Sequence, residues 1–225
     1  NLISATAYPE LTPNMIALSN ERNNTLFVVG DTPMRLGPDG NSLVSWATNN
    51  LGLGLDTEDG LTSTSNYAAN FYPSCQTNDL SGNTVISAPS HMMMRTILRS
   101  DAVSYPWLAP AGTRRGGITN VSSVGYIDSL TGEFTATALN TGQRDTLASI
   151  HVNPITFITG TGLVNYGQYT RQLSASSLDR INVARLVVYL RRQFSQLAKP
   201  YVFEPNDSIT RDEIKGAVES LLLEL

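Results

Sequence analysis

The chain is poor in the residues that build disulfides and metal sites. Its 225 residues include one cysteine, Cys75, and two histidines, His91 and His151. A lone cysteine excludes an internal disulfide and any zinc site made of several cysteines, and the histidines lack the spacing of a metal-binding pair. No apolar run approaches the length that crosses a bilayer, and no signal peptide is visible. These absences favour a soluble protein of a reducing compartment, with no cofactor, no metal and no membrane insertion.

Charged residues are also scarce. They make up 15% of the chain, against a typical quarter, and the formal net charge is -4. Without a positive balance the chain has no overall electrostatic attraction for nucleic acid, so we expect no nucleic-acid partner. Asn, Ser and Thr take the place of the missing charges, which is common in proteins whose surfaces are covered by copies of themselves.

The motifs of common enzyme sites are absent as well. His91 and Asp101 could in principle form a hydrolytic triad with a serine, but the chain has no Gly-x-Ser-x-Gly motif. The segment 160–162 lacks the third glycine of a dinucleotide-binding loop. An acidic loop lacks the spacing and the distal glutamate of a calcium loop; its acids are Asp56, Glu58 and Asp59. We therefore predict that the chain is not an enzyme.

The most regular stretch is the last quarter, where residues 177–199 predict one long helix. Val187, Leu190 and Phe194 share a face, so we expect them to be buried. Ser176 or Ser177 is expected to cap the start, and Pro200 ends the helix because it lacks the N–H group that a helix needs.

Charges on this helix form a second pattern. Arg185, Arg192 and Lys199 lie one heptad apart on the opposite face and make a basic stripe, and the region after the helix is acidic, including Asp212 and Glu213. Such a stripe is usually a solvated helix face. In a self-assembling protein it could instead meet an acidic patch on another copy, and both interpretations stay open.

A second helix is predicted from Ser208 to Leu225. Thr210 and Glu213 have the spacing of a capping box, and an apolar stripe follows. The stripe is still running at the last residue, and the chain starts at Asn1 without a methionine. We expect an internal piece of a longer protein, which alone stays monomeric while the full-length protein polymerises.

The rest of the chain alternates short strands, hairpins and helices. Strands are expected at 26–29, 67–75, 84–87, 121–127, 134–138, 151–158 and 163–169, and helices from Thr12, at 41–50, from Pro89 and near Arg144. The methionines after Pro89 are expected to fill the core, and 51–60 is expected to be a flexible surface loop. This order predicts an α/β fold, a mixed β-sheet flanked by helices with hairpin additions.

Three stretches combine unusual residues in a set order. Residues 100–116 contain an aspartate, then Pro-Trp-Leu-Ala-Pro-Ala, then Arg-Gly; residues 152–170 contain Asn-Pro-Ile and Tyr-Gly-Gln-Tyr-Thr; residues 181–207 contain Asn-Val-Ala-Arg-Leu and Phe-Glu-Pro-Asn-Asp. The motif residues are Asp101, Pro106, Trp107, Pro110, Arg115, Asn153, Pro154, Gly167, Thr170, Arg185, Phe203, Glu204, Pro205, Asn206 and Asp207.

In order and spacing these stretches resemble the contractile tail sheath proteins of long-tailed bacteriophages and related injection machines. Tyr166 stands where that family usually has a tryptophan, and Ala184 replaces one arginine of its Val-Arg-Arg-Leu helix. Within that family, the sequence most resembles the sheath proteins of giant phages of the phiKZ kind. The resemblance covers 67–225, which we expect to be the sheath core domain, whereas 1–66 match no motif and are expected to be an N-terminal sub-domain or insertion.

The resemblance implies a subtilisin-like core without protease residues. It also implies a structural virion protein that stacks as hexameric rings around a tail tube and contracts to drive the tube through the host envelope. Its partners would be other copies of itself, the tail tube protein, and baseplate and tail terminator proteins, with assembly in the host bacterial cytoplasm. The alternatives are a sheath subunit of a related contractile injection system, or an isolated α/β binding or hydrolase domain. Two prolines bracket Trp107, which is expected to pack within the chain, with a neighbouring copy as the alternative.

Overall fold

The computed structural model describes residues 1–38, 40–52, 54 and 56–225, except for the side chain of Asn41. Its centre is a five-stranded sheet in the order β1-β2-β3-β8-β9. The first four strands run parallel and β9 pairs antiparallel with β8. The strands are β1 (Leu2–Ile3), β2 (Phe27–Asp31), β3 (Ala68–Tyr72), β8 (Val152–Ile158) and β9 (Gly162–Asn165). Residues 1–66 thus supply two strands of the same sheet as the rest of the chain, and a domain division at residue 66 stays a prediction.

Helices cover both faces of this sheet. Every residue of β2 and β3 is buried, because their side chains point alternately into two core layers. One layer joins Phe27, Phe71 and Met93 to the helices α3 (Pro89–Val103) and α6 (Ile181–Ala198). The other face is covered by α1 (Thr12–Glu21), α2 (Gly40–Ala47) and α5 (Thr141–Ser149). Met92 and Met93 are buried, which confirms that these methionines fill the core, and the predicted mixed α/β fold is confirmed.

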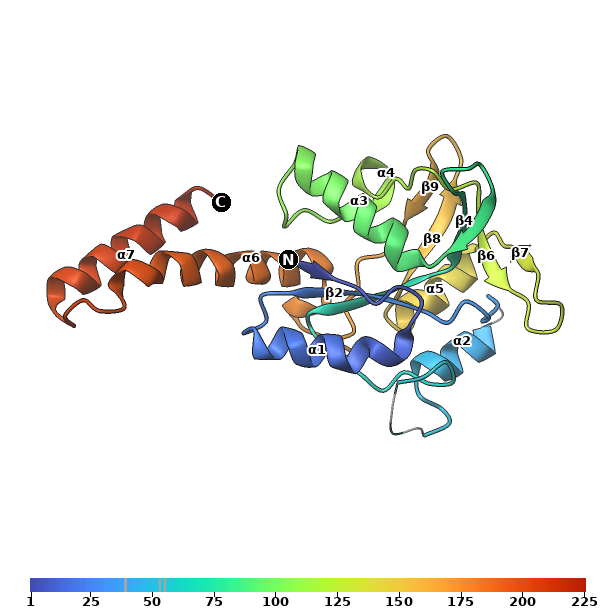
Figure 1. The fold of residues 1–225 in the computed structure, drawn as a ribbon, viewed down its shortest axis with the longest axis horizontal. Helices are drawn as coiled ribbons and strands as arrows, with labels where there is room; N and C mark the ends of the chain where they lie inside the picture. The colour runs from blue at the N-terminus through green and yellow to red at the C-terminus, as the bar shows by residue number, and fades with distance from the viewer. Residues whose placement is uncertain (39, 53, 55) are drawn as a thin grey trace.

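A second, antiparallel sheet extends one end of the body in the order β5-β4-β6-β7 (Figure 1). Its strands are β4 (Ser74–Asn78), β5 (Thr84–Ser87), β6 (Ser123–Ile127) and β7 (Phe134–Ala136), and the short helix α4 (Gly112–Arg115) lies between β5 and β6 in the chain. Both predicted hairpins are confirmed. The single strand predicted at 67–75 is wrong: Pro73, which has no N–H group for a ladder, separates β3 in one sheet from β4 in the other.

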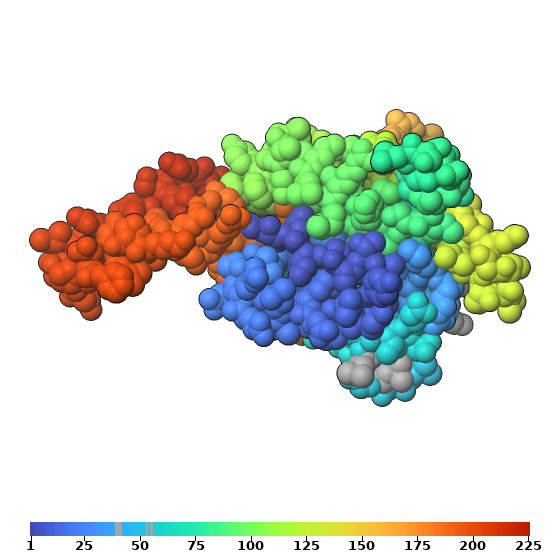
Figure 2. All heavy atoms as spheres, viewed as in Figure 1, coloured from blue at the N-terminus to red at the C-terminus, as the bar shows by residue number. Residues whose placement is uncertain are grey.

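The C-terminal helices form an arm that projects from the body (Figures 1 and 2). The predicted continuous helix 177–199 is wrong at its start, because a 3-10 turn (Ser177–Asp179) and the extended Arg180 precede α6. Val187, Leu190 and Phe194 are half-buried, not buried as predicted. Instead the first turns of α6 bury Ile181, Ala184 and Val188 against the sheet, and its later turns leave the body.

The helix α7 (Ser208–Leu223) runs back along α6 after a short 3-10 turn (Lys199–Tyr201). The Asp207 carboxylate caps α7 by accepting the Thr210 N–H at 2.8 Å, so the capping box predicted from Thr210 and Glu213 is wrong. The cap falls on Asp207 because its backbone is extended there and its side chain reaches the N–H group three residues on. The apolar stripe of α7 is only half-buried, since α6 alone covers it; its half-buried members are Ile214, Ala217, Val218 and Leu221.

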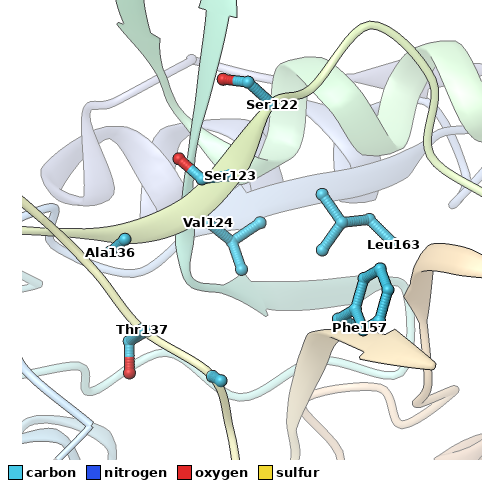
Figure 3. A pocket seen from close by; sticks show the side chains of 8 residues that line it. Ser122, Ser123, Val124, Ala136, Thr137, Phe157 and Leu163 are labelled. Atoms are coloured by element: carbon cyan, nitrogen blue, oxygen red, sulfur yellow. The ribbon is translucent and has the colours of Figure 1, made fainter. Parts of the chain in front are cut away.

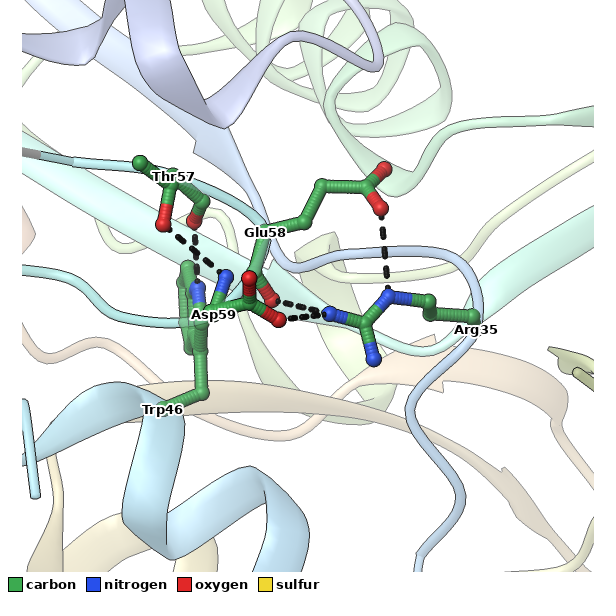
Figure 4. A network of polar contacts seen from close by, with 5 residues as sticks. All are labelled: Arg35, Trp46, Thr57, Glu58 and Asp59. Carbon is green, nitrogen blue, oxygen red and sulfur yellow. Dashed lines mark hydrogen bonds and ion pairs between the residues drawn. The ribbon is translucent and has the colours of Figure 1, made fainter. Parts of the chain in front are cut away.

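The loop at 51–60 was predicted to be flexible, and two of its residues, Leu53 and Leu55, lie outside the described residues. Its acidic part, residues 56–60, is held to the rest of the chain by hydrogen bonds and ion pairs. The Arg35 guanidinium pairs with the carboxylates of Glu58 at 3.1 Å and Asp59 at 2.5 Å, as Figure 4 shows. The Trp46 indole N–H donates to the Thr57 carbonyl at 2.9 Å. These bonds give the loop's charges a structural role. Within the described residues, no helix has the length and apolar character that crossing a bilayer requires.

Candidate functional site

Two motif residues that lie far apart in sequence form an ion pair. The Arg185 guanidinium meets the Asp101 carboxylate at 2.5 Å, and the two side chains are 6% and 23% exposed. The pair joins the last turn of α3 to the first half of α6. The prediction that Arg185 lies on an exposed basic face is therefore wrong, because this part of α6 packs on the sheet and the arginine finds its partner inside the chain.

The neighbouring loop 104–111 packs on the same helix. The Trp107 ring stacks on Tyr105, with centroids 4.9 Å apart, and meets Tyr189 of α6 at 5.1 Å. Trp107 is half-buried. Its contacts are those of an intramolecular packing residue, as expected, at the base of the arm and not in the core.

Asn153 of β8 locks the segment that follows β9. Its amide donates to the carbonyls of Asn70 at 3.0 Å and Tyr169 at 2.8 Å, and its oxygen accepts the Tyr169 N–H at 2.6 Å. Gly167 passes so close that a Cβ atom there would lie 2.8 Å from the Asn153 oxygen and 2.9 Å from Pro154 Cδ. Only glycine fits where the segment after β9 passes over β8, so the motif residues Asn153, Pro154 and Gly167 form one structural unit.

A second asparagine was not singled out from the sequence. The Asn165 amide donates to the carbonyls of Pro110 and Gly167, at 2.8 and 2.9 Å, so it ties the loop before α4 to the end of β9. Gly116, directly after Arg115, lies where a Cβ atom would approach the Asn165 carbonyl to 2.6 Å. Arg115 itself is half-buried at the end of α4.

Thr170 begins the connection to α6. Its hydroxyl donates to the Leu178 carbonyl at 2.8 Å, its N–H donates to the Asp179 carbonyl at 2.9 Å, and its own carbonyl lies 3.0 Å from His151 Nδ1. These bonds fold 170–179 into a closed loop. Most of the predicted motif residues of the body thus lie in one connected region around β8, β9 and the start of α6.

Two buried charged residues were missed from the sequence. Arg171 is 1% exposed, and its guanidinium donates to the carbonyls of Ala47 at 3.1 Å and Ile150 at 2.8 Å, where α2 and α5 end. Burial lowers the pKa of Arg171 to about 10. A lone arginine next to ordinary residues gives no local signal of burial, so only the fold reveals this role.

The other is Asp31, at the end of β2. Its carboxylate accepts the Ser90 N–H at 2.6 Å, the Ser90 hydroxyl at 2.7 Å and the Ala7 N–H at 2.8 Å. Burial raises the pKa of Asp31 above its ordinary value, and these hydrogen bonds partly oppose the rise. The carboxylate stands at the start of α3, where exposed N–H groups favour a negative charge.

The residues considered for catalysis are not brought together. His91 and Asp101 lie ten residues apart on α3, about 15 Å along its axis, and Asp101 pairs with Arg185. Across the described part of the chain, no three side chains of the His, Cys, Asp and Glu types gather as a metal site would require.

The last motif lies at the tip of the arm and is open to solvent. Phe203 is 97% exposed, and the residues around it, Glu204, Pro205, Asn206 and Asp207, are exposed as well. Arg192, Lys199, Asp212 and Glu213, proposed for contacts between copies, are all exposed. Arg192 donates to the Asn1 side-chain oxygen at 2.5 Å.

Among the open hollows on the body are two grooves beside β8 and β9. An apolar groove of about 320 Å³ runs between β6, β7 and the β8–β9 hairpin, with Phe157 and Leu163 on one side and Val124 on the other (Figure 3). A second groove, which we call the tyrosine groove, consists of two adjoining hollows of about 420 and 360 Å³ that share Tyr166, Gly167 and Tyr169. Neither contains a constellation of catalytic groups.

Comparison with known proteins reveals relatives of one kind. No protein-family model matches the chain. The tail sheath protein of Vibrio phage KVP40 is 38% identical over 123 residues, which are 55% of the chain and 17% of that protein. The tail sheath protein of Enterobacteria phage T4 is 32% identical over 178 residues, 77% of the chain and 24% of that protein. The chain thus spans at most about a quarter of the length of these relatives.

Solved structures share the fold. A chain of the anti-feeding prophage baseplate in its contracted state aligns with a TM-score of 0.71 and 23% identity, covering 100% of this chain and 56% of that one. The anti-feeding prophage helical sheath in its contracted state gives 0.64 and 22% identity, covering 93% and 48%. The names of the phage relatives describe a structural tail component, in agreement with the prediction that the chain is not an enzyme. The narrower similarity to giant phages of the phiKZ kind stays a prediction, and the chain is similar to a part of the tail sheath proteins of phages.

Proposed function

We propose that the protein is a subunit of a contractile phage tail sheath, which stacks as hexameric rings around a tail tube and contracts to drive the tube through the host envelope. The observation that carries this proposal is the similarity to the T4 tail sheath protein, which extends over 178 residues at 32% identity. The motif residues on which the resemblance rests support it, because Asp101, Asn153 and Arg185 all form bonds inside the fold.

The partners follow from the same role. Other copies of the subunit and baseplate proteins come first, since relatives of this fold occur in assemblies described as a helical sheath and a baseplate. The tail tube protein and a tail terminator protein would complete the set. The protein would be part of the virion tail and would assemble in the host bacterial cytoplasm.

A sheath subunit of a related contractile injection system is the second candidate. It is favoured by the fold shared with the anti-feeding prophage and with the sheath of an extracellular contractile injection system, at a TM-score of 0.67 and 19% identity for the latter. The higher sequence identity to phage proteins favours the phage sheath.

Contacts between copies are expected to use exposed charges of the arm. Arg192 and Lys199 on one copy would face Asp212 and Glu213 on another, where each exposed pair contributes about 0–1 kcal/mol and mainly sets orientation. Reversing Lys199 to Glu should therefore shift the salt dependence of assembly more than its extent.

Negative-stain electron microscopy of the full-length protein tests the proposal. Tubes or stacked rings are the expected result. Discrete monomers at every protein concentration and salt condition, together with absence of the protein from purified phage tails, would overturn it.

A further inference from the structure

The tip of the arm presents apolar side chains with no cover. Phe203 is 97% exposed and Val202 is 66% exposed, and Pro205 stands beside them in the same turn. The turn is well formed, because Asp207 caps α7 and the Arg211 side chain donates to the Asp207 carbonyl at 3.0 Å. A shaped turn that holds an aromatic ring in water has the character of a binding element.

The tyrosine groove on the body has the complementary character. Each of its two rings lies beside an arginine: the Arg144 guanidinium is 5.5 Å from the Tyr166 ring centre, and that of Arg180 is 4.4 Å from the Tyr169 ring centre. Tyr166 is 52% exposed. The Tyr169 ring also lies 5.0 Å from the His151 ring, so it is the exposed Tyr166 that offers aromatic surface for a ring or a proline, with an arginine beside each tyrosine for a carboxylate.

The charges around the groove are not all positive. Asp145 lines one hollow, and Asp179 pairs with Arg180 at 3.2 Å. Among the lining residues, two arginines against one aspartate leave a small positive surplus, so a carboxylate such as that of Glu204 is favoured there.

The turn cannot reach the groove of its own chain. Arg180 is the residue before α6 and the turn follows its end, so 18 helical residues separate them, about 27 Å along a straight helix. The arm points away from α4, α5 and β9, beside which the groove lies (Figure 1). A contact between the two features therefore requires two molecules.

We propose that the turn 202–207 of one copy docks in the tyrosine groove of a second copy, which deepens and rests on the sheath function proposed above. Phe203 lies against the exposed Tyr166 ring with Pro205 beside it, and Glu204 lies between Arg144 and Arg180. The apolar groove of Figure 3 is the poorer receptor, because no charged residue lines it and Glu204 would have no partner there. The contact joins different surfaces of identical chains, so it repeats head to tail and builds rings or helical arrays.

Cross-linking between singly substituted copies tests the contact. Val202→Cys is placed on one copy and Ala148→Cys, in the tyrosine groove, on the other; the matched control is Ala138→Cys in the apolar groove. Cys75 is fully buried and should not react with a short bis-maleimide. Cross-linked dimers are expected in the Val202→Cys plus Ala148→Cys mixture and not in either variant alone. Equal or greater yield with Ala138→Cys, or no yield above the single variants at high concentration, would overturn the proposal.

A second experiment distinguishes a failure of this contact from a failure of the proposed sheath function. Phe203→Ser and Glu204→Arg are introduced into the full-length protein, and circular dichroism checks that each folds. Phe203→Ser should weaken association by about tenfold or more, as expected for an anchor residue. Arg180→Glu combined with Glu204→Arg should restore part of what Glu204→Arg loses. If tubes form with undiminished yield in Phe203→Ser, the contact is refuted while the sheath function stands; if the unaltered protein forms no tubes, the function itself fails.

Discussion

The buried Arg171 gives the sharpest test of how the body is held together. Its guanidinium donates one hydrogen bond to the last residue of α2, Ala47, and one to Ile150 at the end of α5. Helix ends of this kind carry unpaired carbonyls and a partial negative charge, and the planar fork of arginine serves two of them at once. We predict that Arg171→Lys destabilises the fold even though it keeps the charge.

The magnitude follows from what lysine cannot reach. A single ammonium group on a shorter stem leaves at least one carbonyl without its donor, which costs about 1–3 kcal/mol when buried, and it loses a charge-assisted bond of about 1.5–3 kcal/mol. The charge stays 1% exposed. We expect a loss of about 2–4 kcal/mol, a large share of a typical stability of about 5–15 kcal/mol. Arg171→Met should cost more, because both carbonyls then lose their donor and the buried Asp56 carboxylate loses the positive charge near it.

Urea unfolding followed by tryptophan fluorescence measures the effect, since buried Trp46 lies next to Ala47 in α2. Arg22→Lys is the matched control, because Arg22 is exposed, and its unfolding free energy should change by less than about 0.5 kcal/mol. If Arg171→Lys were as stable as the unaltered chain, or less stable than Arg171→Met, the double-carbonyl account would be refuted.

Three further predictions concern single residues. Gly167→Ala should destabilise the chain by about 1–3 kcal/mol, because the new Cβ atom meets Asn153 and Pro154 at 2.8 and 2.9 Å. Gly216→Ala on α7, with nothing within 4 Å of the new Cβ atom, should stabilise the chain by about 0.5–1 kcal/mol. Thermal melting of both variants checks the difference, and equal shifts in melting temperature would contradict it. Burial raises the pKa of Asp31 above 3.8, so the contribution of Asp31 to stability is fully present below that pH and is lost as the pH rises through the pKa of the folded state. The unfolding free energy of the unaltered chain, minus that of Asp31→Asn, should therefore decline from acid to neutral pH. A difference that rises with pH would contradict this. Phe194→Ala should cost about 1–2 kcal/mol, less than the roughly 3–5 kcal/mol of a packed core, because Phe194 is only half-buried. A urea titration that returned the full core value would show that the arm is packed more tightly.

The sequence located the helices of the arm but not their environment. Periodicity places apolar side chains on one face of α6, yet the helix has two neighbours in succession, first the sheet, around Ile181 and Val188, and then α7. A pattern within one segment cannot report which neighbour covers it or how completely. The middle of α6 is apolar nearly all round, so the sequence pattern there does not indicate which face of the helix is buried.

Long-range polar partners were the other part that could not be predicted. Arg185 looks like a surface residue by type and spacing, and its burial depends on Asp101, which is 84 positions away. Asp31 and Arg171 give no local signal at all, because a charge becomes buried only when distant backbone groups surround it. The motif residues Asn153 and Gly167 could be singled out, but only the fold shows that they are one crossing of two chain segments.

The internal bonds of the motif residues bear directly on assembly. Among the described residues, four polar or aromatic side chains of α6 are held to the body: Arg185 by Asp101, Tyr189 by Trp107, Arg191 by Asn23 and Tyr67, and Arg192 by Asn1. Together they set the direction in which the arm leaves the sheet, and thereby the position of the exposed turn relative to the tyrosine groove. In a head-to-tail contact between identical chains, that relation determines the rotation and rise from one copy to the next, and hence whether the array closes into a ring or climbs as a helix. Loosening the base of the arm, for example by removing Trp107, should therefore leave the turn able to bind while making the assemblies irregular, since the same contact would no longer repeat at a constant angle.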